Sequence, residues 1–331
     1  MELSYLDLYT TDAAWNLAAE QYVFDALPRD RSYLLLWQNK SAVIVGKYQN
    51  TLAEINAEYV REHEIQVVRR LSGGGAVYHD LGNLNFSFIA DAESMGRMNF
   101  QLFCQPVIET LHSLGVPAEL SGRNDMTVDG MKFSGNSQFI RHGRVLHHGT
   151  ILFDSDLEAV SHALHADAEK LQSKGVASVR SRVTNLRFYL GEQTSLAVFR
   201  ETLLAHILRE NPGEAYVFTE ADRQGIDAIR RQRYACWDWN YGLSPAGSME
   251  KKRRIEGCGT VSAVLSTDHG RIQKLNFSGD FFSTLGPEAL VDKLIGVKLS
   301  EEDLREALSD TDPGLYLHGI TRDKLIQLLL Y

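Results

Sequence analysis

Hydrophobic and polar positions along the first third of the chain follow two different periods. Apolar residues recur at helical spacing over 13–27, directly after the N-cap candidate Asp12, and again over 53–63 and 99–114. Shorter runs rich in β-branched and aromatic residues lie between these segments, at 32–37, 42–46, 66–70, 76–78 and 84–89. This pattern predicts helices interleaved with strands.

Two short turns indicate how the central strands pair. Asp129-Gly130 separates the apolar run 126–128 from 131–133, and this dipeptide is typical of a two-residue type I′ hairpin turn. A second turn at His142-Gly143 joins 138–140 to a strand over 145–153. Strands joined by such short turns are antiparallel. The expected fold class is therefore α+β, with a mixed, largely antiparallel sheet and flanking helices.

The C-terminal half has a different pattern. Helices are expected at 156–164 and 196–209, with a Ser-, Arg- and Gly-rich loop over 174–185 between them. The segment 243–247 contains Pro245 and is the best linker candidate. Further elements are predicted beyond it, namely strands 260–266 and 271–277 and helices 287–295, 301–308 and 321–330. Because 331 residues exceed what one core usually holds, we expect two domains, 1–244 and a small α+β domain over 245–331.

Composition narrows the classes of function. The chain is 44% hydrophobic and 23% charged, with a formal net charge of −9, which disfavours binding to nucleic acid. No run is long and apolar enough to span a membrane, and the first residues do not resemble a targeting signal. The three widely spaced cysteines, Cys104, Cys236 and Cys258, suggest a reducing compartment. We therefore expect a cytoplasmic protein that contacts neither nucleic acid nor membrane.

The strongest chemical signal is the glycine run Gly73-Gly74-Gly75, which follows Arg69-Arg70 and precedes a strand. Consecutive glycines allow close approach of the backbone to a ligand, and their N–H groups form a concavity that suits an anion. The arginines can bind phosphate or carboxylate through charge-assisted hydrogen bonds. The alternative is a flexible surface loop with solvated arginines. The run is not a Walker A loop, because no Gly-Lys-Ser/Thr follows.

A second candidate is Lys132, which strand alternation places opposite Met131 and Phe133. If those two side chains pack inward, Lys132 is either a ligand-binding group or a solvated edge charge.

The adjacent pair His147-His148 lies on a predicted strand, so the two side chains point to opposite faces and do not suit one metal ion. We expect one to be buried and one exposed, and a core histidine is the commoner role for either.

Arg180 and Arg182 lie in the predicted loop over 174–185. They either close over a phosphate or remain solvated.

Taken together, these motifs resemble the lipoate–protein ligase family over most of the chain. The matching segments, in the order of the family, are RRLSGGGAVYHD at 69–80, SGRND at 121–125, KFSG at 132–135, HHGT at 147–150, SVRSRVTNL at 178–186 and WDWNYG at 237–242. The resemblance implies a catalytic domain related in fold to biotin protein ligases, over 1–244, and an accessory domain over 245–331. It also implies Mg²⁺-dependent formation of lipoyl-AMP from lipoate and ATP, and then transfer of the lipoyl group to a lysine. The acceptors would be apo lipoyl domains of 2-oxoacid dehydrogenase E2 subunits and the glycine-cleavage H protein.

The resemblance also implies roles for individual residues. The adenylate would be held by Arg70, Gly75, Ala76, Val77, Tyr78 and Lys132, and the lipoyl group by Gly73, Gly74 and Lys132. Lys132 would contact both the acyl carbonyl and the α-phosphate, which makes it the expected catalytic residue. Further candidates are His79, His148, Arg180 and Arg182. A general base is not identified, although His79 and Asp80 are possible.

Three rival functions stay open at this point. The first is an enzyme that uses preformed lipoyl-AMP and cannot form it, which the accessory domain disfavours by analogy with the family. Of the other two, one is an octanoyl or lipoyl transferase of the same superfamily, which needs an activated cysteine near the acyl carbonyl. No cysteine is expected beside the strands of Lys132 or His148, which disfavours this reaction. The other is a non-catalytic protein that binds lipoate or a nucleotide. Biotin ligation fits the double-arginine, triple-glycine motif less well.

Overall fold

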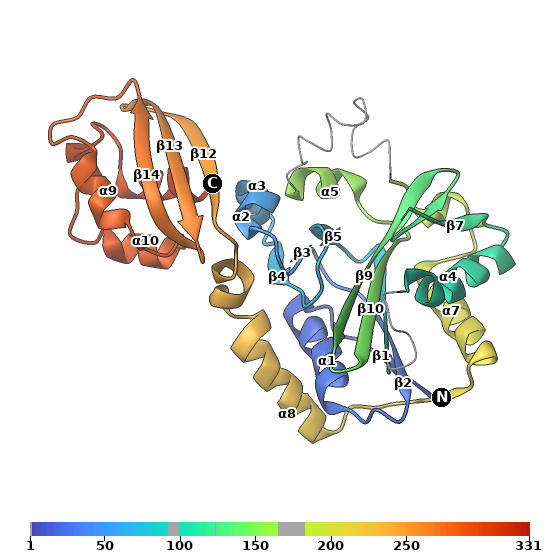
Figure 1. The fold of residues 1–331 in the computed structure, drawn as a ribbon. Helices are drawn as coiled ribbons and strands as arrows, with labels where there is room; N and C mark the ends of the chain where they lie inside the picture. The colour runs from blue at the N-terminus through green and yellow to red at the C-terminus, as the bar shows by residue number, and fades with distance from the viewer. Residues whose placement is uncertain (1, 92–98, 123, 165–182) are drawn as a thin grey trace. The chain divides into compact units, whose positions relative to one another are not determined.

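The computed structural model describes residues 2–91, 99–122, 124–164 and 183–331 (Figure 1). The chain divides into two compact units. The first comprises Met1–Lys47 and Glu64–Cys236, and the second comprises Tyr48–His63 and Trp237–Tyr331. By contacts, the second unit thus begins before the predicted boundary at 244/245 and also includes the segment 48–63. Among the described residues, no helix combines the length and apolar character that crossing a membrane requires.

An eight-stranded sheet forms the centre of the first unit. Its strands, in spatial order, are β11 (Gly213–Ala215), β1 (Leu3–Asp7), β2 (Ser32–Trp37), β6 (Asn83–Asp91), β10 (Arg144–Leu152), β9 (Met131–Arg141), β8 (Asp125–Val128) and β7 (Ala118–Ser121). β1 runs parallel to both β11 and β2, and every other neighbouring pair is antiparallel. The predicted mixed, largely antiparallel sheet is confirmed.

A separate three-stranded sheet carries the glycine run. β3 (Ala42–Val45) lies between β4 (Gln66–Arg69), to which it is parallel, and β5 (Val77–His79), to which it is antiparallel. The chain between β4 and β5 contains Gly73-Gly74-Gly75. This sheet therefore anchors both ends of the glycine loop.

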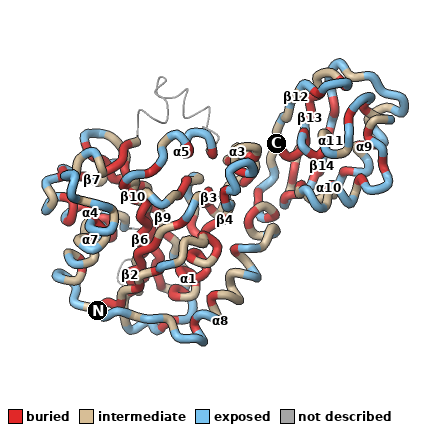
Figure 2. The backbone as a smooth tube through the Cα atoms, turned by 180° about the vertical axis from the view of Figure 1, so that it is seen from behind, coloured by how far each residue is buried: buried red, intermediate tan, exposed pale blue. Residues whose placement is uncertain are grey.

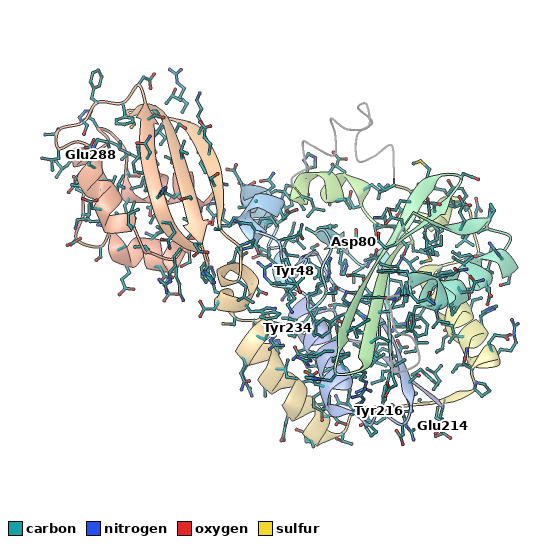
Figure 3. The ribbon with its side chains drawn as sticks, in the orientation of Figure 1. Tyr48, Asp80, Glu214, Tyr216, Tyr234 and Glu288 are labelled. Carbon is teal, nitrogen blue, oxygen red and sulfur yellow. The ribbon has the colours of Figure 1, made fainter. Side chains whose placement is uncertain are left out.

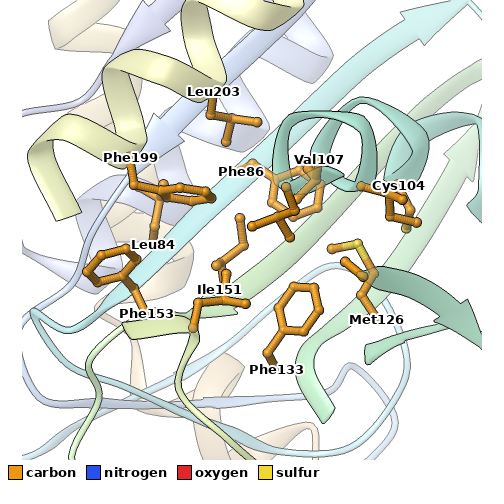
Figure 4. Close-up of a cluster of buried hydrophobic side chains, with 14 of the residues drawn as sticks. Leu84, Phe86, Cys104, Val107, Met126, Phe133, Ile151, Phe153, Phe199 and Leu203 are labelled. Carbon is orange, nitrogen blue, oxygen red and sulfur yellow. The ribbon is translucent and has the colours of Figure 1, made fainter. Parts of the chain in front are cut away.

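Helices cover both faces of the large sheet (Figure 1). On one face lie α4 (Phe100–Ser113) and α7 (Leu196–Glu210), and on the other lies α1 (Ala13–Ala26), against which α8 (Glu220–Ile229) packs. Side chains of α4 and α7 pack onto the strands in an apolar core that includes Phe86, Phe133 and Phe199 (Figure 4). Figure 2 shows the strands beneath as largely buried. Removal of this apolar surface from water stabilises the layers around the site.

The described residues of the first unit also form α5 (Leu157–Ala163), and Leu186–Phe188 forms a short 3₁₀ turn. Two π-helical turns follow α8, at Arg230–Tyr234 in the first unit and at Asp238–Gly242 in the second.

The predicted turn chemistry is confirmed at both hairpins. Asp129 and Gly130 have φ of +49° and +74°, and His142 and Gly143 have φ of +49° and +68°. Two successive positive φ values are what a type I′ turn requires. Asp12 accepts hydrogen bonds from two backbone N–H groups at the start of α1, which confirms its predicted capping role.

The helix predicted over 53–63 is wrong in one respect, because the structure breaks it in two. α2 (Thr51–Glu54) ends before Ile55, and α3 (Ala57–Glu62) begins after Asn56. The side chain of Asn56 accepts a hydrogen bond from the N–H of Tyr59. Asn favours such local bonds over helix continuation, so it starts a new helix here.

The C-terminal part of the second unit is a three-stranded antiparallel sheet with helices. The elements are β12 (Gly247–Ile255), β13 (Gly259–Asp268), β14 (Arg271–Gly279), α9 (Glu288–Leu294), α10 (Glu301–Ala307), the 3₁₀ turn Pro313–Leu315 and α11 (Arg322–Leu330). β12 is not among the predicted strands, because Lys251–Arg254 is a run of four charges. The strand lies at a sheet edge, where charged side chains are common.

Candidate active site

A cavity of about 540 Å³ lies within the first unit, between the large sheet, the small sheet and α1. Its lining combines apolar side chains, glycines and polar groups: Leu17, Trp37, Ile44, Arg70, Gly74, Gly75, Ala76, Val77, His79, Asn85, Asn124, Asp125, Lys132, Gly135, Asn136, Ser137, His148, Gly149 and Thr150. A pocket of this size, mostly apolar with a few polar groups, is typical of a small-molecule site. Eight of the site residues predicted from the sequence line the cavity, namely Arg70, Gly74, Gly75, Ala76, Val77, His79, Lys132 and His148.

The cavity has a buried end and an open end. Trp37, His79 and Asn85 each expose 2% or less of their surface. The Trp37 and His79 rings meet edge to face with centroids 6.0 Å apart, and Trp37 is the register partner of Asn85. In contrast, the side chains of Lys132 and Asp125 are exposed by 39% and 38%. The open end is therefore ionic and the buried end mostly apolar.

Arg70 organises the glycine loop from within the protein. Its Nη2 donates hydrogen bonds to the carbonyl oxygens of Gly73 (2.7 Å) and Gly75 (2.8 Å), and its Nη1 donates to that of Ile44 (3.1 Å). Its Nε donates to Ser72 Oγ (3.1 Å). Burial lowers the Arg70 pKa to about 10, which leaves the side chain charged at neutral pH. The Arg70 guanidinium thus holds the glycine loop in place through hydrogen bonds to its carbonyl oxygens.

The middle glycine of the run is required by geometry. Gly74 has φ of +96°, and a Cβ atom there would lie 2.9 Å from Arg70 Nη2. At Gly75 such an atom would have no neighbour within 4 Å among the residues that the structure describes. Gly74 is therefore needed for the shape of the loop, and Gly75 is free to approach a ligand.

Arg69 does not line the cavity. It is fully buried, and its Nη1 donates to the carbonyl oxygens of Gly46 and Lys47, both at 3.0 Å. Desolvation lowers its pKa to about 10. The alternative of a flexible loop with solvated arginines does not describe either residue.

Lys132 lies at the open end of the cavity and points away from buried Phe133, as strand alternation predicts. Its Nζ lies 2.8 Å from Asp125 Oδ1. A β-bulge between β8 and β9, at Met126/Thr127, shifts the register beside it. Gly135 faces the lysine, since a Cβ at Gly135 would lie 3.2 Å from Lys132 Nζ. The ammonium is thus held at a wall from which an anionic ligand is reachable.

His148 lines the cavity and belongs to a buried chain of hydrogen bonds. Its Nδ1 lies 2.9 Å from Glu20 Oε1, and its Nε2 lies 2.6 Å from Ser72 Oγ. Glu20 Oε1 also accepts from Ser87 Oγ (2.6 Å), which accepts from Trp37 Nε1 (2.9 Å). Through Ser72 the chain continues to Arg70, so a buried carboxylate offsets a buried guanidinium.

Sequence reasoning missed Glu20, Ser72 and Ser87. Glu20 lies on α1 among buried residues, where an acid exposes 1% of its surface. A charge on the apolar face of a helix is the one signal in the sequence that marks it, because buried acids are rare unless paired.

The expectation that only one of the two adjacent histidines is buried is wrong. His147 and His148 are exposed by 0% and 8%. Their strand lies inside the large sheet, so helix α4 covers one face and the cavity wall occupies the other. His147 receives a hydrogen bond from Gln138 Nε2 (3.0 Å) and stacks on Phe103.

Cys104 lies closer to this strand than expected. Its Sγ is 3.9 Å from His147 Nε2. The thiol is fully buried, and burial raises its pKa to about 12, so it is neutral and unreactive at physiological pH. It lies on the core side of β10, opposite the face from which His148 reaches the cavity.

The two candidates for a general base have structural partners. Asp80 (Figure 3) accepts hydrogen bonds from the N–H groups of Gly82 (2.9 Å) and Asp156 (2.7 Å). Desolvation, with a further contribution from the Arg70 charge, lowers the His79 pKa to about 3. His79 is therefore neutral and a very weak base.

The other predicted residues divide into three groups. Ala76 and Val77 line the cavity beside Gly75. Tyr78 is buried on β5, and Gly73 contributes its carbonyl oxygen to Arg70 and to Ser137 Oγ (2.8 Å). Arg180 and Arg182 lie outside the described residues.

Within the described ranges, no group of three or more His, Cys, Asp or Glu side chains is placed to hold a metal ion. Asp125 is the acidic side chain among the described residues that line the cavity. Mg²⁺ in nucleotide sites is commonly held by one or two carboxylates together with phosphate oxygens, so this donor set fits a nucleotide-borne ion.

Comparison with family models assigns both parts of the chain. Residues 12–208 match the lipoyl protein ligase A/B catalytic domain, and residues 244–329 match the C-terminal domain of bacterial lipoate protein ligases. The chain is 43% identical over 321 residues to the Bacillus subtilis lipoate-protein ligase LplJ, covering 96% of this chain and 97% of that protein.

Solved structures agree. The bipartite lipoate protein ligase of Thermoplasma acidophilum, described together with its E2 lipoyl domain, has a TM-score of 0.66 at 28% identity, covering 73% of this chain and 97% of that one. A lipoate-protein ligase A bound with ATP has a TM-score of 0.62 at 26% identity, covering 73% of this chain and all of that one. This chain belongs to the lipoate–protein ligase family.

Proposed function

We propose that this protein joins lipoate to ATP to form lipoyl-AMP and then transfers the lipoyl group to a lysine of a partner protein. The observation that carries the proposal is the division of the cavity. Its buried end, with Leu17, Trp37 and Ile44, suits an acyl tail, and its open end, with Lys132 and the glycine loop, suits the reacting carboxylate and phosphate.

The first step brings two anions together, because the lipoate carboxylate attacks the α-phosphate. Lys132 is proposed to lie between them and to stabilise the charge that develops on the phosphate oxygens. The N–H groups near Gly75, Ala76 and Val77 would hold the adenylate, since Arg70 fixes the loop carbonyls and so orients the peptide units. Mg²⁺ carried by ATP, with Asp125 as its protein partner, would neutralise the pyrophosphate.

The second step transfers the acyl group to an amine. The leaving group is AMP, and the amide nitrogen loses a proton. Lys132 is proposed to polarise the acyl carbonyl during this attack. Neither Asp80 nor His79 is proposed as the base, because the first accepts backbone hydrogen bonds and the second has a low pKa.

The acceptors proposed are lipoyl domains of 2-oxoacid dehydrogenase E2 subunits and the glycine-cleavage H protein. An archaeal structural relative was described with its E2 lipoyl domain. We propose that residues 1–244 carry out both chemical steps and that 245–331 form an accessory domain. We place the reaction in the cytoplasm, where the three thiols would stay reduced.

The rival transferase reaction lacks support in the cavity. That chemistry needs a thiolate at the acyl carbonyl, and none of the three cysteines lines the cavity. Cys104, the nearest to β10, has a raised pKa and belongs to the apolar core.

The test is a reaction of the purified protein with ATP, Mg²⁺, lipoate and an apo lipoyl domain. A gain of one lipoyl group on the acceptor that depends on ATP, together with release of AMP and pyrophosphate, is expected. Pyrophosphate release without modification of the acceptor would support the adenylation step and would show that this lipoyl domain is not the acceptor. Binding of lipoate and ATP without release of either product would support a binding protein instead.

A further inference from the structure

The buried end of the cavity contains a hydrogen-bond donor whose direction is fixed by the protein. The chain that fixes it begins at Asn16, which is fully buried. Asn16 Nδ2 donates to the carbonyl oxygens of Thr10 (3.0 Å) and Gln38 (2.9 Å), so its amide has one orientation. The same nitrogen lies 2.9 Å from Asn39 Oδ1. Asn39 therefore presents its oxygen to Asn16 and its nitrogen elsewhere.

That nitrogen reaches His79. Asn39 Nδ2 lies 3.0 Å from His79 Nδ1, and an amide NH₂ donates only, so Nδ1 is the acceptor. Since the ring is neutral, its proton is on Nε2. His79 Nε2 has no hydrogen-bond partner within the described part of the chain, although the residue is exposed by only 2%. His79 lines the cavity, and this N–H is a buried donor whose acceptor the described residues do not supply.

A second polar atom of the same cavity is also unpaired. Asn85 Oδ1 accepts from Asn83 Nδ2 at 2.9 Å, and Asn85 Nδ2 has no partner among the residues described. Asn85 and His79 both approach Trp37, the first as its strand partner and the second through its ring. Two buried donors without acceptors thus share the end of the cavity that is otherwise walled by Leu17, Ile44 and Trp37.

An unpaired buried donor favours a ligand that supplies the missing acceptor, because it has already lost its water. A saturated acyl chain ends in a methyl group and supplies none. A dithiolane ring has sulfur atoms at the same depth, and sulfur is a weak acceptor. We infer that His79 determines specificity in this cavity, with its Nε2–H favouring an acyl group that carries a distal acceptor, the lipoyl group, over an octanoyl group of the same chain length.

This inference rests on the proposed function, and the experiment separates the two. Lipoate and octanoate compete for transfer to an apo lipoyl domain, and the ratio of their kcat/KM values is read from the acceptor mass. The variants are His79→Phe, which keeps a ring without a donor, and His79→Gln, whose amide places an N–H close to the Nε2 position. The control is His142→Asn, in an exposed hairpin turn.

For His79→Phe we expect the lipoate-to-octanoate ratio to fall by about fivefold to tenfold, a modest factor because sulfur accepts weakly. The fall should come from a rise in KM that is larger for lipoate than for octanoate, since His79 lines the cavity for both acids. His79→Gln should restore most of the ratio, and His142→Asn should not change it. Equal losses for both acids in His79→Phe, or an unchanged ratio, would overturn the inference. Absence of lipoyl transfer by the unmodified protein would instead overturn the proposed function.

Discussion

Lys132 Nζ lies 2.8 Å from Asp125 Oδ1 at the open end of the cavity, and both side chains keep more than a third of their surface exposed. An exposed ion pair contributes little to stability, because water screens both charges. The ion pair therefore serves to position the Lys132 side chain rather than to stabilise the fold. Asp125 holds the ammonium at the cavity wall, and an arriving phosphate or carboxylate takes its place as the partner of Lys132.

Replacement of Lys132 is expected to disable the first chemical step. Lys132→Ala should lower the rate of adenylation by about 10²–10³, the usual loss for one preorganised charge donor at a transition state. Asp125→Asn should have a smaller effect on this rate, since the ammonium remains and the phosphate oxygens of ATP would still hold the Mg²⁺ that Asp125 is proposed to contact. The measurement is pyrophosphate release with lipoate and saturating ATP. Melting temperatures near that of the unmodified protein in both variants would confirm that the loss is chemical, and near-normal adenylation by Lys132→Ala would contradict its proposed role.

Two neighbouring glycines should respond differently to the same substitution. Gly74→Ala forces a Cβ to within 2.9 Å of Arg70 Nη2 at a positive φ, so it should distort the loop and reduce both stability and activity. The Cβ of Gly75→Ala meets no atom of the described part of the chain within 4 Å, so this variant should leave the melting temperature unchanged. If the loop backbone holds the adenylate at this point, Gly75→Ala should still raise KM for ATP. An equal fall in melting temperature for the two variants would contradict this interpretation of the loop.

Ser72 links a buried base to a buried cation, so its removal should be costly. Ser72→Ala leaves Arg70 Nε and His148 Nε2 without their partner. Loss of a partner from buried polar groups typically costs about 1–3 kcal/mol. Urea unfolding should show this loss, and adenylation should slow because the loop carbonyls are less well fixed. Ser113→Ala, at a helix end remote from the cavity, provides the comparison. Equal stability in the two variants would show that the buried chain does not hold the loop.

The sequence predicts those parts of the site that depend on residues close together along the chain. Three glycines after two arginines indicate a ligand loop, and strand alternation places Lys132 opposite Phe133. Glu20 and Asn39 are not predictable in the same way, because their roles depend on partners 128 and 40 residues away. The expectation that one of His147 and His148 is exposed is wrong for a related reason. Alternation along a strand says which face a side chain takes, and only the packing on each face says that both faces are covered.

The secondary structure likewise divides into elements that the sequence predicts and elements that it does not. Asp-Gly and His-Gly turns require positive φ, so both hairpins are visible in the sequence. β12 is not visible, because an edge strand need not alternate apolar with polar residues, and four consecutive basic residues hide it.

Thiol chemistry should be dispensable. Cys104→Ala is expected to retain ligase activity within about twofold and to lose some stability, as for a large-to-small change in a packed core. In the native protein a thiol reagent should modify Cys236, which is partly exposed, and spare Cys104 and Cys258, which are buried. The check is mass spectrometry after alkylation, with acceptor lipoylation assayed on the alkylated protein. Loss of transfer in Cys104→Ala with a normal melting temperature would return the thioester mechanism to consideration.

Acidification should destabilise the protein through two buried histidines. Burial lowers the pKa of His79 and of His147 from 6.5 to about 3. Below pH 6.5 the unfolded chain therefore binds protons that the folded chain excludes until about pH 3. The unfolded state binds more protons throughout this window, so stability falls as the pH falls. Each histidine should remove up to about 1.4 kcal/mol of the free energy of unfolding per pH unit.

One of these residues can be replaced to isolate the effect. The ring of His147 packs against Phe86, Phe100 and Phe103, so His147→Phe keeps the aromatic cluster and removes the titrating group. Urea unfolding at pH 7 and pH 4.5 should show a loss of stability on acidification that is smaller by about 2 kcal/mol in the variant than in the unmodified protein. His142→Asn serves as the control for removal of a histidine from the surface. Because every carboxylate still titrates in all three proteins, the difference between their slopes belongs to the histidine alone. If His147→Phe loses as much stability as the unmodified protein, the buried ring is already protonated at pH 7 or is hydrated in the folded state.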